Sequence, residues 1–345
     1  MLTLFSSDHA LHHPRTEMAD GKLVSAVEIP SRAELIVDAV ETARLGPIEP
    51  PQTIEFDTLT SVHDARYVEF LKEFWRAWLD SGRDPKVHDA FPFVWPMHGL
   101  RRITTRHLDG LMGRYSFDAG TPMGPGTWKA ALSSAAVART GALRVVEDQQ
   151  PVFSLCRPPG HHAMPDAFGG YCFLNNAAIA AQTFLDAGSS RVAILDVDYH
   201  HGNGTQSIFY NRRDVLFISI HADPMDEYPY FLGHADELGA GVGEGANLNL
   251  PLPLGTGWED YKEALALALR TVNQSGAEAL VVSLGLDTYE GDPISQFRLN
   301  TLDFVKMGAA IRSVDKPTLI VLEGGYATDA LASNALAFFE GYLGG

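Results

Sequence analysis

Five strongly apolar runs in this chain each end directly in a cluster of polar residues. The runs cover residues 152–156, 192–197, 215–220, 279–285 and 318–323. Segments with apolar residues at helical spacing alternate with them, at 130–146, 177–187, 258–274, 301–311 and 329–342. Such alternation implies crossover connections and a mainly parallel sheet with helices on both faces. The sequence therefore predicts a doubly wound α/β fold with one active site outside the carboxyl ends of the strands.

The N-terminal part of the chain has weaker signals of regular structure. Residues 2–5 are typical of a short first strand. Ser31 and Glu34 match a capping box that would open an amphipathic helix over residues 35–43. Apolar residues at helical spacing predict a further helix over residues 65–79. Both helices are expected at the surface of the domain.

Residues 81–126 are rich in Pro, Gly, His and aromatic residues and show no sustained period. An irregular connection of this length inside a compact domain usually serves a function. Phe93, Trp95 and Met97 would be costly to leave in water. We interpret the stretch as a loop insert at the entrance of the site or at a subunit interface, within a single domain spanning residues 1–345.

The composition excludes several classes of protein. With 46% hydrophobic and 20% charged residues, the chain is an ordinary globular protein. Its 26 basic and 43 acidic residues give a net charge of −17, which argues against nucleic acid and permits small cations as partners. Two cysteines give no disulfide framework, and no run has the features of a signal peptide or a membrane span. We expect a cytoplasmic protein with no nucleic-acid or membrane partner.

A candidate metal site lies at the end of the apolar run 192–197. Asp198 and His200 follow this run directly, and Asp287 follows the run 279–285. A catalytic zinc ion is typically held by three protein ligands and keeps one position open. The spacing of Asp198 and His200 is common by chance, so the prediction depends on convergence of the strand ends. If they converge, Asp287 is the natural third ligand.

Other polar residues at the strand ends are candidates for catalysis. Asp196 lies two residues before Asp198 and is suited to orient an imidazole. His161 and His162 follow a stiff Pro-Pro-Gly turn and can divide the roles of general base and electrostatic support. Tyr326 follows two glycines and can donate a hydrogen bond to a developing oxyanion, although a packed tyrosine in a glycine-rich turn is the simpler alternative.

Five motifs together indicate a family. They are Arg157-Pro-Pro-Gly-His-His-Ala163, Gly169-Gly-Tyr-Cys-Phe-Leu-Asn-Asn176, Asp196-Val-Asp-Tyr-His-His-Gly-Asn-Gly-Thr-Gln206, Ser283-Leu-Gly-Leu-Asp287 and Glu323-Gly-Gly-Tyr326. They resemble the superfamily of zinc-dependent histone deacetylases and acetylpolyamine amidohydrolases over nearly the whole chain. The bacterial acetylpolyamine amidohydrolases are most similar, because they share the length, the insert and Asp292-Pro-Ile294. The resemblance implies the arginase-deacetylase fold, with eight parallel strands.

The resemblance also implies a role for individual residues. It implies catalytic roles for His161, His162, Asp196 and Tyr326. It implies a zinc ion, with iron or cobalt as alternatives, that is bound by Asp198, His200 and Asp287. It implies structural potassium sites formed near the zinc by Asp196, Asp198, His200, Ser219 and Ile220, and farther away by Phe209, Arg212 and Val215. It implies substrate contacts from Gly170, Tyr171, Tyr228 and Ile294, with Asp109 and Asp118 as candidate partners of a distal ammonium group.

The implied function is zinc-dependent removal of the acetyl group from N-acetylated polyamines or diamines by a homodimer. A broader protein or peptide acetyl-lysine deacetylase is the alternative. A binuclear ureohydrolase on the same fold and a non-catalytic acetyl-lysine-binding module are more distant alternatives. Two positions depart from parts of the family pattern. Asn203 stands where some members have a carboxylate, and Gly120 aligns with an acidic residue that meets the distal ammonium in some polyamine enzymes.

Overall fold

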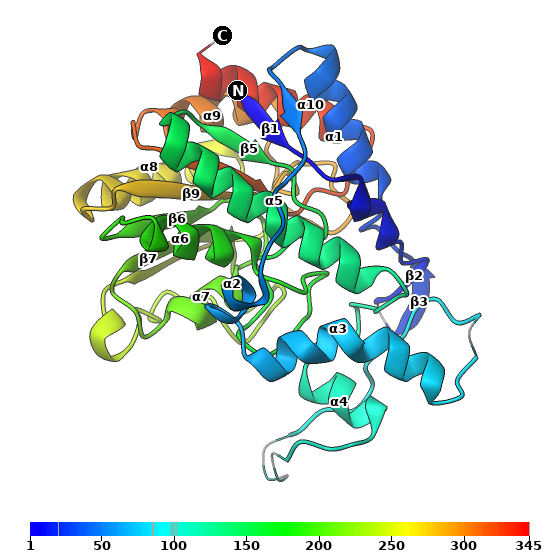
Figure 1. The fold of residues 1–345 in the computed structure, drawn as a ribbon. Helices are drawn as coiled ribbons and strands as arrows, with labels where there is room; N and C mark the ends of the chain where they lie inside the picture. The colour runs from blue at the N-terminus through cyan, green and yellow to red at the C-terminus, as the bar shows by residue number, and fades with distance from the viewer. Residues whose placement is uncertain (20, 85, 98, 100, 102, 345) are drawn as a thin grey trace.

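The computed structural model describes residues 1–344 except 20, 85, 98, 100 and 102. Its centre is one sheet of eight strands, and the helices pack around this sheet (Figure 1). In their order across the sheet, the strands are β4 (Ile48–Glu49), β1 (Leu2–Leu4), β5 (Val152–Ser154), β10 (Thr318–Leu322), β9 (Ala279–Leu284), β6 (Val192–Asp196), β7 (Val215–Ala222) and β8 (Asn247–Leu252). All neighbouring strands in this sheet run parallel. A separate antiparallel hairpin joins β2 (Thr16–Ala19) and β3 (Lys22–Ser25). The predicted α/β fold class is confirmed.

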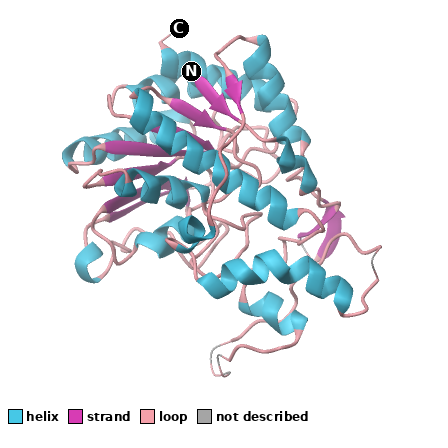
Figure 2. Ribbon diagram, viewed as in Figure 1, coloured by secondary structure: helices cyan, strands magenta, loops and turns pink. Residues whose placement is uncertain are grey.

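Helices cover both faces of the sheet (Figure 2). Alternate residues of β6 belong to different core clusters, Val192 and Ile194 to one and Ala193 and Leu195 to the other. The helices of the first cluster are α2 (Phe56–Thr60), α3 (Ala65–Asp80), α4 (Leu108–Arg114), α5 (Thr127–Asp148), α6 (Asn176–Asp186) and α7 (Asn203–Phe209). Those of the second are α1 (Ser31–Thr42), α8 (Trp258–Gln274), α9 (Thr301–Arg312) and α10 (Leu331–Leu343). In the described part of the chain, none of the helices combines the length and apolarity needed to cross a membrane.

The order of the strands determines where the functional residues meet. The candidate residues follow β5, β10, β9 and β6, which are consecutive neighbours in the sheet. In the register of the sheet, Asp196 of β6 lies beside Ser283 of β9. Because these strands are parallel, their carboxyl ends lie at the same edge and the loops that follow them can share one site.

The start of α1 differs from the sequence prediction. The helix begins at Ser31 with Pro30 as its N-cap, and no side chain caps it. Pro30 already has helical angles, φ −54° and ψ −36°, so Ser31 lies inside the first turn. The predicted capping box is therefore wrong, whereas the helix predicted over 258–274 is confirmed as α8.

The insert over residues 81–126 contains one helix that was not predicted, α4. Arg114 of the insert forms an ion pair with Asp166 at 2.7 Å, which ties the insert to the rest of the domain. Phe93 is 67% exposed and Met97 is 66% exposed. Positions 85, 98, 100 and 102 of the insert lie outside the described residues. The insert is thus anchored to the domain and presents apolar side chains at its surface.

Candidate active site

Asp198, His200 and Asp287 form a buried group at the carboxyl ends of β6 and β9. Each offers a ligand atom, and these atoms all lie within 4.8 Å of one another. The Nδ1 atom of His200 lies 3.4 Å from an oxygen of Asp198 and 3.2 Å from an oxygen of Asp287. A Cβ atom at position 324 would lie 2.5 Å from Asp287 and 2.6 Å from Asp198, so Gly324 keeps space beside both carboxylates.

The charges of this group favour a divalent cation. Burial and the adjacent Asp198 carboxylate raise the pKa of Asp287 to about 7, because two buried anions repel each other. Burial alone would lower the pKa of His200, but the two carboxylates raise it to about 10. An imidazole nitrogen and carboxylate oxygens are ligands that zinc accepts. The residues therefore fit a zinc ion, and iron or cobalt would use the same donors.

A second group of potential metal ligands, His161, Cys172 and Glu323, is better explained as structural. One carboxylate oxygen of Glu323 accepts the backbone N–H groups of Gly160 at 2.7 Å and His161 at 3.1 Å. Burial raises the pKa of the Cys172 thiol well above its usual value, so the thiol stays protonated. Glu323 thereby fixes the turn that carries the paired histidines.

The two paired histidines have different partners. The Nδ1–H of His161 donates to Asp196 at 2.9 Å, and that of His162 donates to the amide oxygen of Asn203 at 2.6 Å. Burial opposes a charge on His161, but Asp196 and Asp198 raise its pKa to about 10. Burial and the neighbouring His161 lower the pKa of His162 well below its usual value. The pair thus combines a charged imidazole with a neutral one whose Nε2 can accept a proton.

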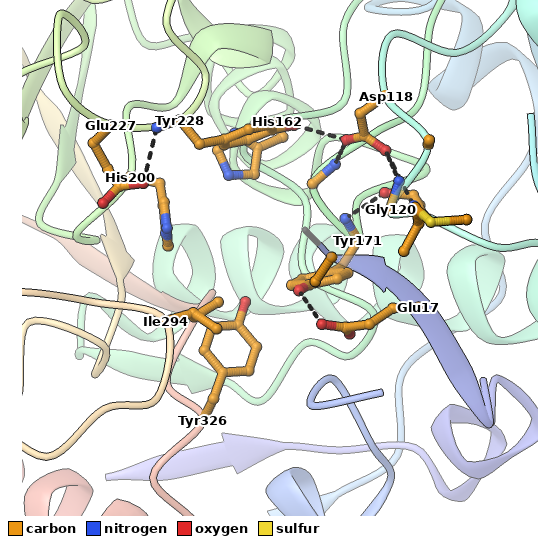
Figure 3. A pocket seen from close by; sticks show the side chains of 15 residues that line it. Glu17, Asp118, Gly120, His162, Tyr171, His200, Glu227, Tyr228, Ile294 and Tyr326 are labelled. Atoms are coloured by element: carbon orange, nitrogen blue, oxygen red, sulfur yellow. Dashed lines mark hydrogen bonds between the residues drawn. The ribbon is translucent and has the colours of Figure 1, made fainter. Parts of the chain in front are cut away.

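Tyr326 points into the cavity that His162 and His200 also line (Figure 3). Its backbone N–H donates to Asp292 at 2.7 Å, and the guanidinium of Arg32 lies 4.5 Å from the centre of its ring. Burial raises the pKa of Tyr326 well above its usual value, so the phenol remains a hydrogen-bond donor. Arg32 and Asp292 support the phenol, and the sequence patterns alone did not assign either of them a role.

The cavity has a volume of about 360 Å³ and aromatic walls. The ring of Tyr228 stands edge-on to His162, with the ring centres 5.2 Å apart, and Tyr171 forms another wall (Figure 3). Gly170 and Ile294 also line the cavity. The structure therefore brings together all four residues whose substrate contacts were implied by the resemblance.

Among the described residues, three carboxylates line the cavity, and only one of them was predicted to do so. Asp118 was predicted, whereas Glu17 and Glu227 were not. Glu17 lies on the hairpin strand β2, far from the motifs in the sequence, so no local pattern identified it. Asp109 is not among the described residues that line the cavity. It lies in α4 and forms an ion pair with Arg83.

The residues that the resemblance places on potassium fall into two neighbourhoods. Near the metal-ligand group, the pairing of β6 with β7 brings together Asp196, Ser219 and Ile220. Farther away, the end of α7, the following turn and the start of β7 provide Phe209, Arg212 and Val215. Potassium binding at either place stays a prediction.

The fold and the buried Asp-His-Asp group define a metal-dependent hydrolase of a known family. Residues 26–342 match the family model of the histone deacetylase domain, so the chain belongs to this family. It is 52% identical over 344 residues to acetylpolyamine amidohydrolase 2 of Pseudomonas aeruginosa, covering 100% of this chain and 99% of that protein. It is 45% identical over 348 residues to the acetylpolyamine amidohydrolase of Mycoplana ramosa, covering 100% of both.

A solved structure agrees with these sequence matches. The crystal structure of acetylpolyamine aminohydrolase from Burkholderia pseudomallei is 42% identical and superposes with a TM-score of 0.94. The match covers 99% of this chain and 98% of that one. The family and the fold implied by the sequence motifs are therefore confirmed.

Proposed function

We propose that this protein hydrolyses the acetyl amide of N-acetylated polyamines or diamines and releases acetate and the free amine. The observation that supports this most directly is the convergence of a metal-ligand group, a neutral imidazole and a phenol in one cavity with acidic walls. Full-length similarity to proteins named acetylpolyamine amidohydrolases supports the same substrate class.

The proposed metal is zinc, held by Asp198, His200 and Asp287. When bound there, the ion supplies Lewis acidity to the amide carbonyl and to water. The glycine at position 324 leaves room beside the ligand carboxylates, and the backbone N–H of Gly324 donates to Asp198 at 2.8 Å. This hydrogen bond orients one of the ligands, as outer partners of metal ligands commonly do.

The remaining chemistry belongs to three side chains. Neutral His162 accepts a proton from the attacking water through Nε2, because its Nδ1–H is held by Asn203. The charged ring of His161, 4.0 Å from that of His162, stabilises the negative charge that develops. The Tyr326 phenol donates a hydrogen bond to the oxyanion. His162 then returns its proton to the leaving amine as the C–N bond breaks.

Glu17 is the proposed partner of the substrate's distal ammonium group. It is buried, and it accepts hydrogen bonds from two neutral groups, the Val27 N–H at 3.1 Å and the Tyr171 hydroxyl at 3.2 Å. Burial raises the pKa of Glu17, and a neighbouring ammonium group would favour its charged form. Among the described residues, no cationic side chain pairs with this carboxylate, so a substrate ammonium group could take that position.

Glu17→Gln is expected to lower kcat/KM for N-acetylputrescine about tenfold, the effect of losing one hydrogen bond to a charged group. N-pentylacetamide, in which a methyl group replaces the ammonium, is expected to be hydrolysed at an unchanged rate. Glu227→Gln is the matched control, because Glu227 also lines the cavity but accepts the Tyr199 hydroxyl at 2.8 Å. Equal losses on both amides in Glu17→Gln would contradict this assignment.

A substrate panel on zinc-loaded protein tests the proposed function against the acetyl-lysine alternative. We expect kcat/KM to be higher on N-acetylputrescine and N-acetylcadaverine than on an acetyl-lysine peptide, since acidic side chains line the cavity and favour a cationic linear amine. A strong peptide preference would overturn the substrate proposal.

Light scattering on the same sample tests the proposed homodimer, in which the exposed Phe93 and Met97 of the insert contact a second copy. A mass equal to one 37.6 kDa chain would contradict it.

Metal removal tests the two kinds of ion separately. Chelation is expected to abolish turnover and to lower the unfolding temperature, and added zinc is expected to restore both. An ion present at a hundred times its Kd stabilises the folded state by about 2.7 kcal/mol.

The unfolding temperature is expected to be higher in a potassium salt than in a tetramethylammonium salt of equal ionic strength. Identical temperatures in the two salts would argue against the potassium sites. The cytoplasmic location and the absence of a nucleic-acid partner stay predictions from composition.

A further inference from the structure

Asp118 lines the substrate cavity, and within the described residues it accepts four hydrogen bonds from the protein itself. Its Oδ1 accepts the backbone N–H groups of Gly120 at 3.0 Å and Thr121 at 3.1 Å. Its Oδ2 accepts the backbone N–H of Gly170 at 2.6 Å and the Tyr228 hydroxyl at 2.8 Å. A carboxylate offers about four acceptor sites. These four donors therefore use the acceptor capacity that a substrate ammonium group would need.

The two donors to Oδ2 belong to different walls of the cavity (Figure 3). Tyr228 is one wall, and Gly170 precedes Tyr171, which forms another. Gly170 and Tyr171 have φ angles of +54° and +64°, a left-handed conformation that is uncommon for a tyrosine. The Thr121 hydroxyl accepts the backbone N–H of Tyr171 at 3.0 Å. The segment that contains Asp118 thus holds both residues of this strained turn.

The neighbouring residue Phe117 supports the same two walls. Its ring stacks on Tyr228, with the ring centres 6.4 Å apart and the planes 25° apart. Its backbone N–H donates to the Phe168 carbonyl at 3.1 Å. A Cβ atom at Gly169 would lie 2.5 Å from the Phe117 ring, so this ring packs tightly against the turn. Residues 117 and 118 together bridge the channel walls.

We infer that Asp118 is a positioning residue that sets the width of the channel by tying Tyr228 to the Gly170 turn, and that it does not bind the substrate's ammonium group. The inference deepens the proposed function and rests on it. If Asp118 turned to a substrate cation, the Tyr228 hydroxyl and the Gly170 N–H would lose their acceptor, which is costly for partly buried groups. The position of the walls matters for catalysis because Tyr228 packs against His162 and because a Cβ atom at Gly170 would lie 2.2 Å from the same ring.

The test compares zinc-loaded Asp118→Asn, Tyr228→Phe and the double variant on N-acetylputrescine and N-pentylacetamide. Asp118→Asn is expected to lower kcat/KM about tenfold or more on both amides, leaving their ratio at the wild-type value. Tyr228→Phe keeps the ring and removes one donor, so it is expected to produce part of this loss. In the double variant, the Tyr228 change is expected to add little, because the hydrogen bond is already broken. Zinc content and thermal unfolding show whether each variant is folded.

When all variants fold, two outcomes would overturn the inference. The first is a loss in Asp118→Asn that is confined to N-acetylputrescine, which would make Asp118 a direct cation partner. The second is full additivity of the two substitutions, which would show that Asp118 does not act through Tyr228. If Asp118→Asn does not fold, retention of full activity on both amides by Tyr228→Phe overturns the inference. If the wild-type protein hydrolyses neither amide, the proposed function fails, and the same cycle is measured on an acetyl-lysine peptide.

Discussion

His162→Ala is expected to lower kcat by about a hundred- to ten-thousand-fold, the usual contribution of a positioned general base. The imidazole is neutral, lines the cavity and keeps its Nδ1–H on Asn203, so Nε2 is the atom that receives the proton. The expected loss is in the chemical step, and single-turnover measurements on saturated enzyme report it directly. Because His162 is outside the proposed ligand set, zinc content is expected to stay at one ion per chain.

Added imidazole provides the control for His162→Ala. A small base that enters the vacated space is expected to restore part of the turnover, whereas a variant damaged elsewhere would not respond. Near-normal turnover in His162→Ala, with zinc bound and the fold intact, would show that another group accepts the proton. His161 is the other imidazole of the pair, but its bond to Asp196 keeps it charged.

Tyr326→Phe is expected to cost about 3 kcal/mol of transition-state stabilisation, or roughly a hundredfold in kcat, as with other oxyanion donors. The hydroxyl acts on charge that develops during the reaction, so KM is expected to change little. The ring keeps its packing against Arg32, and the backbone bond to Asp292 is unaffected. Steady-state kinetics on the preferred amide measure both parameters.

Tyr171→Phe is the matched control for Tyr326→Phe. The two rings pack edge-on with their centres 5.7 Å apart, and both line the cavity. The Tyr171 hydroxyl, however, donates to Glu17, so its removal is expected to have a smaller effect on kcat for a neutral amide. Similar losses in kcat from the two substitutions would remove the special role assigned to Tyr326.

The residues of the candidate site were predictable where they directly follow apolar strands. Asp198 and Asp287 come two and three residues after buried strands, and parallel strands open on the same edge. The order of the strands was not predictable from the pattern alone. The pairing of β6 with β9 joins segments that are separated in the chain by β7, β8 and α8.

The sequence patterns did not identify the residues that reach the site from segments far from the motifs. Glu17 lies on a two-stranded hairpin. The strands of this hairpin are short and largely exposed, so no apolar periodicity indicated them in the sequence. Arg32 lies at the start of a predicted amphipathic helix, and nothing in that pattern indicated a role for it. In the structure it donates hydrogen bonds to the carbonyl oxygens of Glu323 and Gly325. Asp118, which the resemblance implied as a candidate substrate contact, does line the cavity. The four hydrogen bonds that Asp118 accepts come from loops that only the tertiary structure brings together.

The pairing of β6 with β9 has a consequence for biosynthesis. Two of the three proposed ligands, Asp198 and His200, leave the ribosome well before Asp287, which follows β9. A nascent chain that has not yet reached Asp287 holds only two of the three proposed ligands. Stable binding of the proposed ion is therefore expected only after β6 and β9 have paired, because a preformed site rarely exists in an unfolded chain.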